Sequence, residues 1–284
     1  MTRLIDLHTH SVASDGSDTP AILLKNARDA GLSAVALCDH DTVSGLEEFE
    51  NTATAYPDIE AIPGVELSTR LFKKEVHIVG LYVDRNCPDL TEPLVFLRQS
   101  RLTRNKRIIE LLRTAGYMIT EDDVASFAQG ESAGRPHIAR ALVAKGYFED
   151  IQSAFTKCLK PNTPFYVGKE FLPPDQCIQI IHAAGGLAFW AHPMHERRGD
   201  RSFLRKFLKQ LMGWGLDGLE CRYALFTERQ QAITNSVAEE LNLLKSGGSD
   251  YHGQNQPTIH LGSGTGSLEV PYEYLEAIRE HLKK

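Results

Sequence analysis

The chain has 284 residues, of which 42% are hydrophobic, and its formal net charge is −6. This length and composition predict one large α/β domain, or a barrel carrying a small insertion, with ample apolar material for a core. The negative charge excludes a global basic surface for duplex nucleic acid, so we expect no duplex DNA partner.

The five cysteines are widely spaced along the chain, and no Cys-x-x-Cys motif is present. This pattern predicts neither a disulfide framework nor a zinc knuckle, and it is typical of proteins in a reducing cytosol. The first residues lead directly into a strand pattern and lack the features of a signal peptide. No apolar run is long enough to span a bilayer. We therefore expect a cytoplasmic protein with no membrane partner.

The first predicted strand, at residues 3–8, leads into a His-x-His pair. Because side chains alternate along a strand, His8 and His10 point to the same face, where two imidazoles can bind one divalent metal. Two histidines near a chain end are also common on protein surfaces, so the pair alone decides nothing. The following loop ends at Thr19, a predicted helix N-cap, with Pro20 at the first helical position.

Strand and helix patterns alternate through residues 1–84. Further strands are predicted at 34–38, 59–67 and 76–83, with helices from 20 to 30 and from 44 to 55. This alternation is typical of a parallel α/β sheet. The same alternation returns in residues 171–284. Strands are predicted there at 187–191, 216–221 and 243–246, and helices at 175–184, 202–212, 227–241 and 272–283.

Residues 85–170 contain no strong strand pattern. Helices are predicted there at 94–115, 121–129, 135–145 and 149–159. We interpret this segment as a helical insertion between the two parts of a barrel, where it would act as a substrate cap. The polar face of its first helix is rich in Arg and Lys. That face is either solvated or directed toward a phosphate-rich substrate, and the sequence favours neither alternative.

Nine candidate metal ligands lie close to the ends of predicted strands. They are His8, His10, Asp15, His40, Glu66, His77, His192, Asp250 and His252. In parallel α/β barrels the site lies at the carboxyl ends of the strands, so a barrel would bring these side chains together. Imidazole and carboxylate ligands without thiolate suit Mn, Fe or Zn in a multinuclear hydrolytic site. Two such ions about 3.5–4 Å apart can bind the attacking and leaving oxygens of a phosphoryl displacement.

The sequence resembles the polymerase and histidinol phosphatase (PHP) family of metal-dependent phosphoesterases. The matching stretches are 6–11, 14–16, 38–41, 63–66, 76–80, 191–193 and 248–252, in the order of the family. The resemblance implies the PHP fold, a distorted (β/α)7 TIM-like barrel, here with a helical insertion domain. It also implies three divalent metal ions, with Mn preferred over Fe or Zn. One metal would be bound by His8, His10, Glu66 and Asp250. A second would be bound by Asp15, His40 and His252, and a third by Glu66, His77 and His192.

Within the family, the chain most resembles the 3′,5′-nucleotide bisphosphate phosphatases and the related 5′→3′ exoribonuclease. The match is the Arg-x-His-x-Ala-Arg motif at 135–140. It implies that Arg135 and His137, as catalytic and substrate-binding residues, hold substrate phosphate; from the residues alone they would be a capped helix start. The segment after His192 departs from the subgroup, which has Gly-Arg-Tyr there. Arg197 or Arg198 either replaces that arginine or is a solvated loop charge.

The resemblance implies hydrolysis of the 3′-phosphate of nucleoside 3′,5′-bisphosphates, giving nucleoside 5′-monophosphates. The same chemistry would shorten 5′-phosphorylated RNA from its 5′ end, so the expected partner is a small nucleotide or short oligonucleotide. Two alternatives are a phosphatase for another small ester, such as histidinol phosphate, and a non-catalytic module that keeps the fold. Asp39 and Asp41 are expected to support a neighbouring ligand or to cap, and Glu220 matches no ligand of the family.

Overall fold

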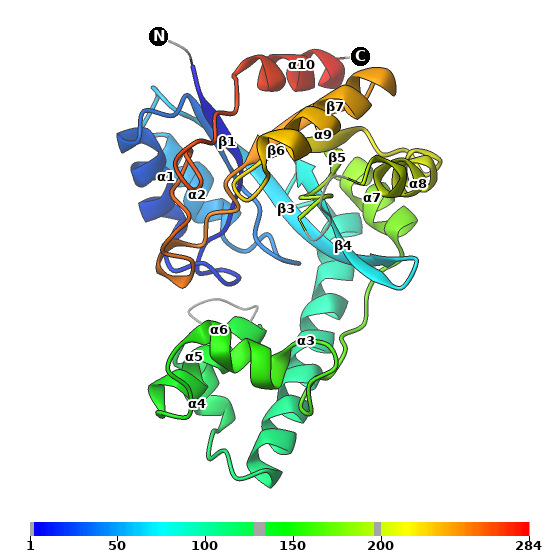
Figure 1. Cartoon of the computed structure of the whole chain (residues 1–284). Coiled ribbons are helices and arrows are strands. Elements are labelled where there is room, and N and C mark those ends of the chain that lie inside the picture. The colour runs from blue at the N-terminus through cyan, green and yellow to red at the C-terminus, as the bar shows by residue number, and fades with distance from the viewer. Residues whose placement is uncertain (1–2, 128–133, 196–199, 284) are drawn as a thin grey trace.

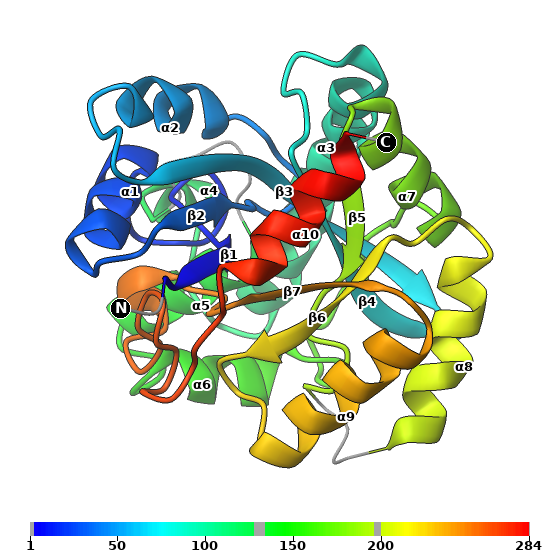
Figure 2. The same cartoon turned by 90° about the horizontal axis from the view of Figure 1, so that it is seen from above.

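The computed structural model describes residues 3–127, 134–195 and 200–283. Seven strands form one sheet in the order β1 to β7, which curls into a nearly closed barrel (Figures 1 and 2). The strands are β1 (Ile5–Thr9), β2 (Ala34–Leu37), β3 (Glu60–Leu71), β4 (Lys74–Leu81), β5 (Leu187–Trp190), β6 (Gly218–Tyr223) and β7 (Leu244–Gly248). The barrel class predicted from the sequence is therefore confirmed.

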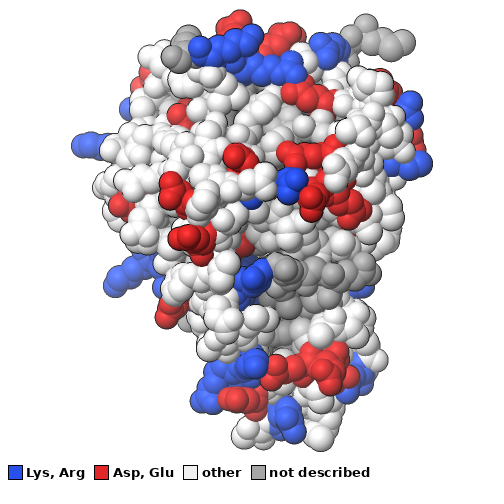
Figure 3. Space-filling model, turned by 180° about the vertical axis from the view of Figure 1, so that it is seen from behind, with Lys and Arg blue, Asp and Glu red and all other residues white. Residues whose placement is uncertain are grey.

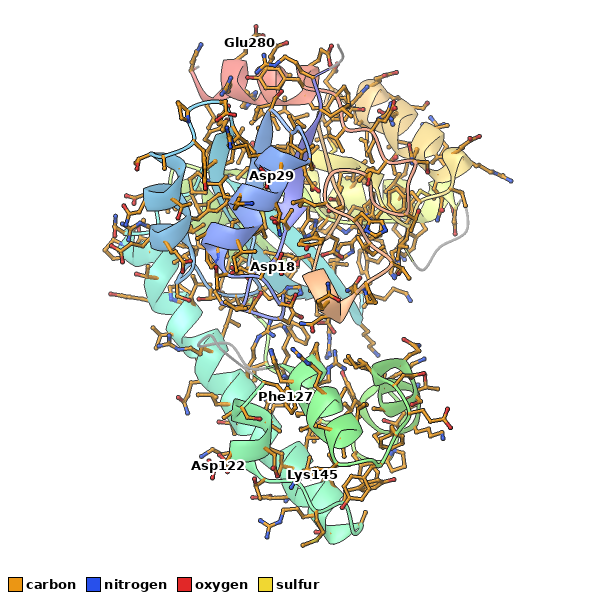
Figure 4. The ribbon with its side chains drawn as sticks, turned by 90° about the vertical axis from the view of Figure 1, so that its left-hand side faces the viewer. Asp18, Asp29, Asp122, Phe127, Lys145 and Glu280 are labelled. Carbon is orange, nitrogen blue, oxygen red and sulfur yellow. The ribbon has the colours of Figure 1, made fainter. Side chains whose placement is uncertain are left out.

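The first and last strands meet through backbone hydrogen bonds. The amide of His10 donates to the carbonyl of Tyr251, and the amide of Asp250 donates to the carbonyl of His8, both at 2.9 Å. Tyr251 also donates its hydroxyl to Asp18 at 2.9 Å, and Figure 4 labels Asp18 at the barrel edge that faces the helical lobe. These bonds bring the two ends of the sheet together where the candidate ligands lie.

Six helices pack on the barrel. They are α1 (Pro20–Asp29), α2 (Leu46–Ala53), α7 (Pro174–Ala183), α8 (Arg201–Met212), α9 (Glu228–Glu240) and α10 (Glu273–Leu282). Helix α1 begins as predicted, with Pro20 in its first turn and the Thr19 hydroxyl accepting from the amide of Ile22. Helix α10 lies across one end of the barrel (Figure 2), where Leu275 and Ile278 join the apolar side chains that fill its interior. The opposite end remains available for a site.

The predicted parallel sheet is wrong at β4. This strand pairs antiparallel with both β3 and β5, whereas the other neighbours are parallel. Phe72 and Lys73 connect β3 to β4 with φ angles of 49° and 64°, as in a tight type I′ hairpin. Parallel neighbours need a long crossover, and two residues cannot provide one. The reversal brings the beginning of β4, with His77, to the end of the barrel where the parallel strands finish.

The segment between β4 and α7 is helical and forms a lobe beyond that end of the barrel (Figure 1). Its helices are α3 (Pro88–Thr114), α4 (Glu121–Ala125), α5 (Arg135–Ala144) and α6 (Ile151–Ala154), with a π-helical turn at Phe155–Leu159. The first half of α3 packs on the barrel through Leu90 and Leu94. Its second half joins a separate apolar core through Ile108 and Leu112. One long helix therefore connects both parts.

Charged side chains are mixed over the surface. On the face shown in Figure 3, Lys and Arg are interspersed with Asp and Glu on both the barrel and the lobe. Among the helices of the described ranges, none has the length and apolar composition needed to cross a membrane.

Candidate metal centre and substrate cleft

Glu66 of β3 lies at the centre of the gathered side chains and is fully buried. One of its oxygens, Oε2, lies 3.4 Å from His8 Nε2, 3.3 Å from His10 Nε2 and 2.8 Å from His40 Nδ1. The other, Oε1, lies 2.9 Å from His77 Nδ1 and 3.0 Å from His192 Nε2. One carboxylate thus faces five histidines from four segments of the chain.

The other three candidates complete the group on the side of β1 and β7. His10 Nε2 lies 3.1 Å from Asp250 Oδ1, and His252 Nε2 lies 3.2 Å from Asp15 Oδ1. His40 Nε2 lies 3.9 Å from the second oxygen of Asp15. The structure therefore brings all nine candidates of the sequence to the same end of the barrel.

The donor atoms fit divalent metal ions. Three sets of side chains have ligand atoms within 4.8 Å of one another: His8, His10, Glu66 and Asp250; His10, Asp15, His40 and His252; and His40, Glu66 and His77. The first set equals the first predicted ligand set, and the others overlap the second and third. Buried atoms His8 Nε2, His10 Nε2 and Glu66 Oε2 make no hydrogen bond within the described residues. A buried polar atom without a hydrogen bond costs free energy, because it has lost its contacts with water. Binding a cation offsets that cost.

The electrostatics of the group favour anionic carboxylates. Burial raises the pKa of Glu66, but the facing His40, His77 and His8 outweigh it and hold that pKa well below its usual range. Burial, together with His252, lowers the pKa of His10 to about 3, so this imidazole is neutral at pH 7. Burial lowers the pKa of His77 and of His252, but the facing carboxylates outweigh it and raise both pKa values to about 10. Since ionised carboxylate and neutral imidazole are the forms that bind metals, metal binding there would release protons.

Glu220 supports two of the candidate ligands, a role that the sequence did not indicate. Its Oε1 lies 3.0 Å from His8 Nδ1, and its Oε2 accepts a hydrogen bond from the backbone amide of His192. His192 has a φ of 31°, a region that is unusual for a residue with a side chain. Glu220 lies within β6, the one strand without a predicted ligand, and its place near the end of the strand predicted at 216–221 was the available signal. Nearby, Tyr223 donates its hydroxyl to Asp250 at 3.0 Å.

Asp39 holds the loop that carries Asp15. Its carboxylate accepts hydrogen bonds from the Ser11 amide at 2.9 Å, the Ser11 hydroxyl at 2.6 Å and the Ser14 hydroxyl at 2.5 Å. The side chain is 2% exposed, so the bonds are shielded from water. Asp39 thus supports a neighbouring candidate ligand, as the sequence predicted.

Asp41 connects the barrel to the lobe. Arg101 of α3 donates to Asp41 Oδ2 at 3.0 Å, and Lys169 of the returning segment donates to the same oxygen at 3.2 Å. Lys169 lies 3.9 Å from Glu75, which is 3.5 Å from His77 Nε2. Burial and the neighbouring Arg101 lower the pKa of Lys169 to about 8. Positive charge from the lobe therefore reaches the edge of the metal centre.

For the basic face of α3, the sequence left two alternatives, a solvated face or one directed toward the substrate, and each describes a part of it. Arg101 and Arg104 are buried, and Arg101 belongs to the connection just described. Lys106 and Arg107 are about 60% exposed and pair with Glu121 and Glu110 on the surface of the lobe. One part of the face is directed at the mouth of the barrel, and the other is solvated.

Arg135 and His137 lie at the beginning of α5, and only Arg135 lines the cavity beside the metal centre. This cavity of about 510 Å³ is also lined by Lys73, Lys74, His77 and His192, among others. The guanidinium of Arg135 donates to the carbonyl of Leu159 at 3.1 Å.

His137 is 1% exposed, and its Nδ1 accepts from the amide of Gly134 at 2.8 Å. Burial lowers the pKa of its imidazole. The proton of the neutral ring is therefore on Nε2. Arg197 and Arg198 lie outside the described residues.

Comparisons with known proteins agree with this geometry. The family model of the PHP domain matches residues 6–212. A 5′-3′ exoribonuclease of Haemophilus influenzae is 37% identical over 255 residues, which cover 89% of this chain and 91% of that protein. A 3′,5′-nucleoside bisphosphate phosphatase of Chromobacterium violaceum is 32% identical over 249 residues, or 87% of each chain. A solved amidohydrolase structure from Chromobacterium violaceum, with bound sulfate and no metal, has a TM-score of 0.84, 31% identity and 96% coverage of both chains.

The chain therefore belongs to the PHP family. It is a metal-dependent phosphoesterase, an enzyme that hydrolyses phosphoric esters.

Proposed function

We propose that the enzyme removes the 3′-phosphate from nucleoside 3′,5′-bisphosphates and shortens 5′-phosphorylated RNA from its 5′ end. The observation that carries this proposal is the cavity that Arg135 of the lobe shares with His77 and His192 of the barrel. A substrate with two phosphates needs a cationic pocket beside the hydrolytic centre. Relatives named for each of the two activities are similar over nearly nine tenths of this chain, which supports the same assignment.

We further propose that the nine gathered side chains bind three divalent ions, with Mn preferred over Fe or Zn. When bound, such ions lower the pKa of a water molecule and stabilise the negative charge that develops on the phosphoryl oxygens. The protein supplies buried carboxylates that stay ionised, since the pKa values of Glu66, Asp15 and Asp250 all lie well below their usual range despite burial. The donor chemistry supports the proposal, and the ion identity stays a prediction.

In this proposal the lobe recognises the phosphate that is not hydrolysed. The planar guanidinium of Arg135 binds a 5′-phosphate through two parallel hydrogen bonds, and Lys73 and Lys74 add positive charge to the same cavity. His137 is buried, and its Nδ1 accepts from the amide of Gly134, so in this proposal it fixes the beginning of α5 and thereby positions Arg135.

A histidinol phosphate phosphatase is less favoured, because its substrate carries an ammonium group that Lys73, Lys74 and Arg135 would repel. A non-catalytic module is also less favoured, since all nine candidate ligands are present and gathered. A cytoplasmic location and the exclusion of duplex DNA stay predictions. The five free cysteines support the first, and the mixed surface charge in Figure 3 supports the second.

The test compares adenosine 3′,5′-bisphosphate, adenosine 3′-monophosphate and histidinol phosphate with the Mn-loaded enzyme. We expect kcat/KM for the bisphosphate to exceed the other two by about 100-fold, since they leave the cationic pocket unpaired. Arg135→Ala should remove most of that preference, and Asp250→Ala supplies the inactive background. Equal hydrolysis of histidinol phosphate, or an equal loss on all three substrates in Arg135→Ala, would contradict the proposal.

A further inference from the structure

A second cavity, of about 750 Å³, lies on the other side of the metal centre. It reaches the centre at Asp15, which follows β1, and at His252, which follows β7. The first cavity reaches the same centre at His77 of β4 and at His192 after β5. Because β1 and β7 meet on the side of the barrel opposite β4 and β5, the nine candidate ligands separate the two cavities.

The second cavity is formed by the barrel and the lobe together. Gln152 and Phe155 come from α6 and the π-helical turn of the lobe, whereas Leu225, Gln254 and Ile259 come from the barrel. The barrel wall is held in place next to Asp15, since the side chain of Asn255 donates to the Asp15 carbonyl at 2.7 Å. The amide of Gln254 donates to Ser17 at 2.8 Å. The cavity thus has a defined wall beside a candidate ligand.

The lining of the two cavities differs in charge. Lys73, Lys74 and Arg135 line the first cavity, which suits phosphate. Within the described residues, no Lys or Arg lines the second, whose ionisable side chains are Asp15, Asp150 and His252, so it lacks the cations that suit phosphate. The remainder of its lining includes carboxamides, such as Gln152 and Gln254, and apolar side chains, such as Phe155 and Leu225.

Such a lining matches the chemistry of a nucleoside. The carboxamides can donate to and accept from the edges of a base, and the apolar side chains can contact its faces. Leu225 is 45% exposed, so its side chain is accessible to an apolar face of a ligand in the cavity.

We propose that the second cavity binds the nucleoside that follows the scissile phosphate in a 5′-phosphorylated oligoribonucleotide. This inference rests on the proposed function. In the reaction, a bond forms between a water oxygen and phosphorus while the bond from phosphorus to the 3′ oxygen of the first nucleotide breaks. That 3′ oxygen takes a proton, and the phosphate stays on the 5′ oxygen of the following nucleoside. A nucleoside bisphosphate has no such nucleoside and leaves the second cavity empty.

The test compares adenosine 3′,5′-bisphosphate with 5′-phosphorylated diadenylate in the Mn-loaded enzyme. Leu225→Trp narrows the cavity, and Gln152→Ala removes an exposed carboxamide from it. We expect Leu225→Trp to lower kcat/KM for the dinucleotide about tenfold, mainly by raising KM, and Gln152→Ala to lower it about threefold. Hydrolysis of the bisphosphate should stay within about twofold of wild type in both variants. Met118→Trp, at a residue 63% exposed that lines neither cavity, is the matched control.

A loss that is equal for both substrates, or no loss in either variant, overturns the inference. If Leu225→Trp alters the circular dichroism spectrum, the test rests on Gln152→Ala, for which kcat/KM of the dinucleotide and of the bisphosphate are compared in the same way. A wild-type enzyme that hydrolyses the bisphosphate but not the dinucleotide refutes this inference and leaves the proposed function standing. A wild-type enzyme that hydrolyses neither refutes the proposed function.

Discussion

Glu220 shows how one side chain can position two others. Its two oxygens contact the ring of His8 and the backbone of His192, which belong to different strands and different proposed metal positions. With the side chain 3% exposed, water does not compete for these contacts. A hydrogen bond to the second ring nitrogen of a metal-binding histidine fixes the orientation of the ring and increases its basicity.

We predict that Glu220→Gln weakens binding of Mn by about 10- to 100-fold, because it removes the anionic partner of His8. Calorimetric titration of the metal-free protein with Mn measures the effect. Glu110→Gln, at a surface position 64% exposed, is the control and should bind as wild type does. Unchanged affinity in Glu220→Gln would show that the contact has no positioning role.

The nine candidate ligands could be chosen from the sequence, because a His or a carboxylate residue recurs close to the end of nearly every predicted strand. Glu220 and Tyr223 could not, since their roles depend on register and on partners far along the chain. His8 and Glu220 are 212 positions apart, and nothing local in either segment indicates that their side chains meet. Arg135 was predicted only through its family motif, and its place in the cavity required the structure.

Among the elements, α3 determines where the lobe lies. It is anchored to the barrel by apolar contacts and by the ion pairs of Asp41 with Arg101 and Lys169. Both cations are less than a tenth exposed, as is Asp41. Their attraction lowers the pKa of Asp41 below its usual range despite burial, so this contribution to stability is present at neutral pH and is lost in strong acid.

We predict that Asp41→Asn lowers the free energy of unfolding at pH 7 by about 3–5 kcal/mol, because it removes the carboxylate that two buried cations share and, among the described anions, leaves Lys169 only its 3.9 Å contact with Glu75. Urea denaturation measures the loss. The control is Glu110→Gln, which breaks an exposed pair with Arg107 and should cost less than about 1 kcal/mol. A loss in Asp41→Asn no larger than that of the control would show that the connection is solvated.

The reversal of β4 was missed although the sequence carries a signal for it, because only residues 68–75 separate the two predicted strands and parallel neighbours need a crossover of about a dozen residues. Residues 59–67 and 76–83 have the apolar composition of buried strands, and such a composition does not encode direction. Direction follows from the two residues of the hairpin, Phe72 and Lys73, neither of which is a usual choice for positive φ. The alternation of the remaining strands with helices did predict their parallel arrangement, since each intervening helix provides the crossover that parallel neighbours need.

On the scale of the whole molecule, the proposed metal centre joins the two ends of the sheet. His8 belongs to β1 and His10 follows it directly, whereas Asp250 and His252 follow β7. Only a few backbone hydrogen bonds join the two strands near these residues, because the chain continues from β7 into a loop. Ions bound between them would stabilise the closed barrel relative to the unfolded chain.

We predict that Mn at about 100 times its dissociation constant raises the free energy of unfolding by about 2.7 kcal/mol per independent site. The midpoint of thermal unfolding, with and without a chelator, measures this shift. Asp250→Ala is the matched comparison and should lose most of the shift while keeping the circular dichroism spectrum of the wild type. A chelator that leaves the wild-type midpoint unchanged would contradict the proposed centre.

The position of the ligands along the chain has a consequence during protein synthesis. Seven of the nine precede residue 193, whereas Asp250 and His252 leave the ribosome well after the others. A nascent chain that ends before residue 250 lacks one carboxylate and one imidazole of the proposed centre. The proposed hydrolytic activity therefore cannot begin until both have been made.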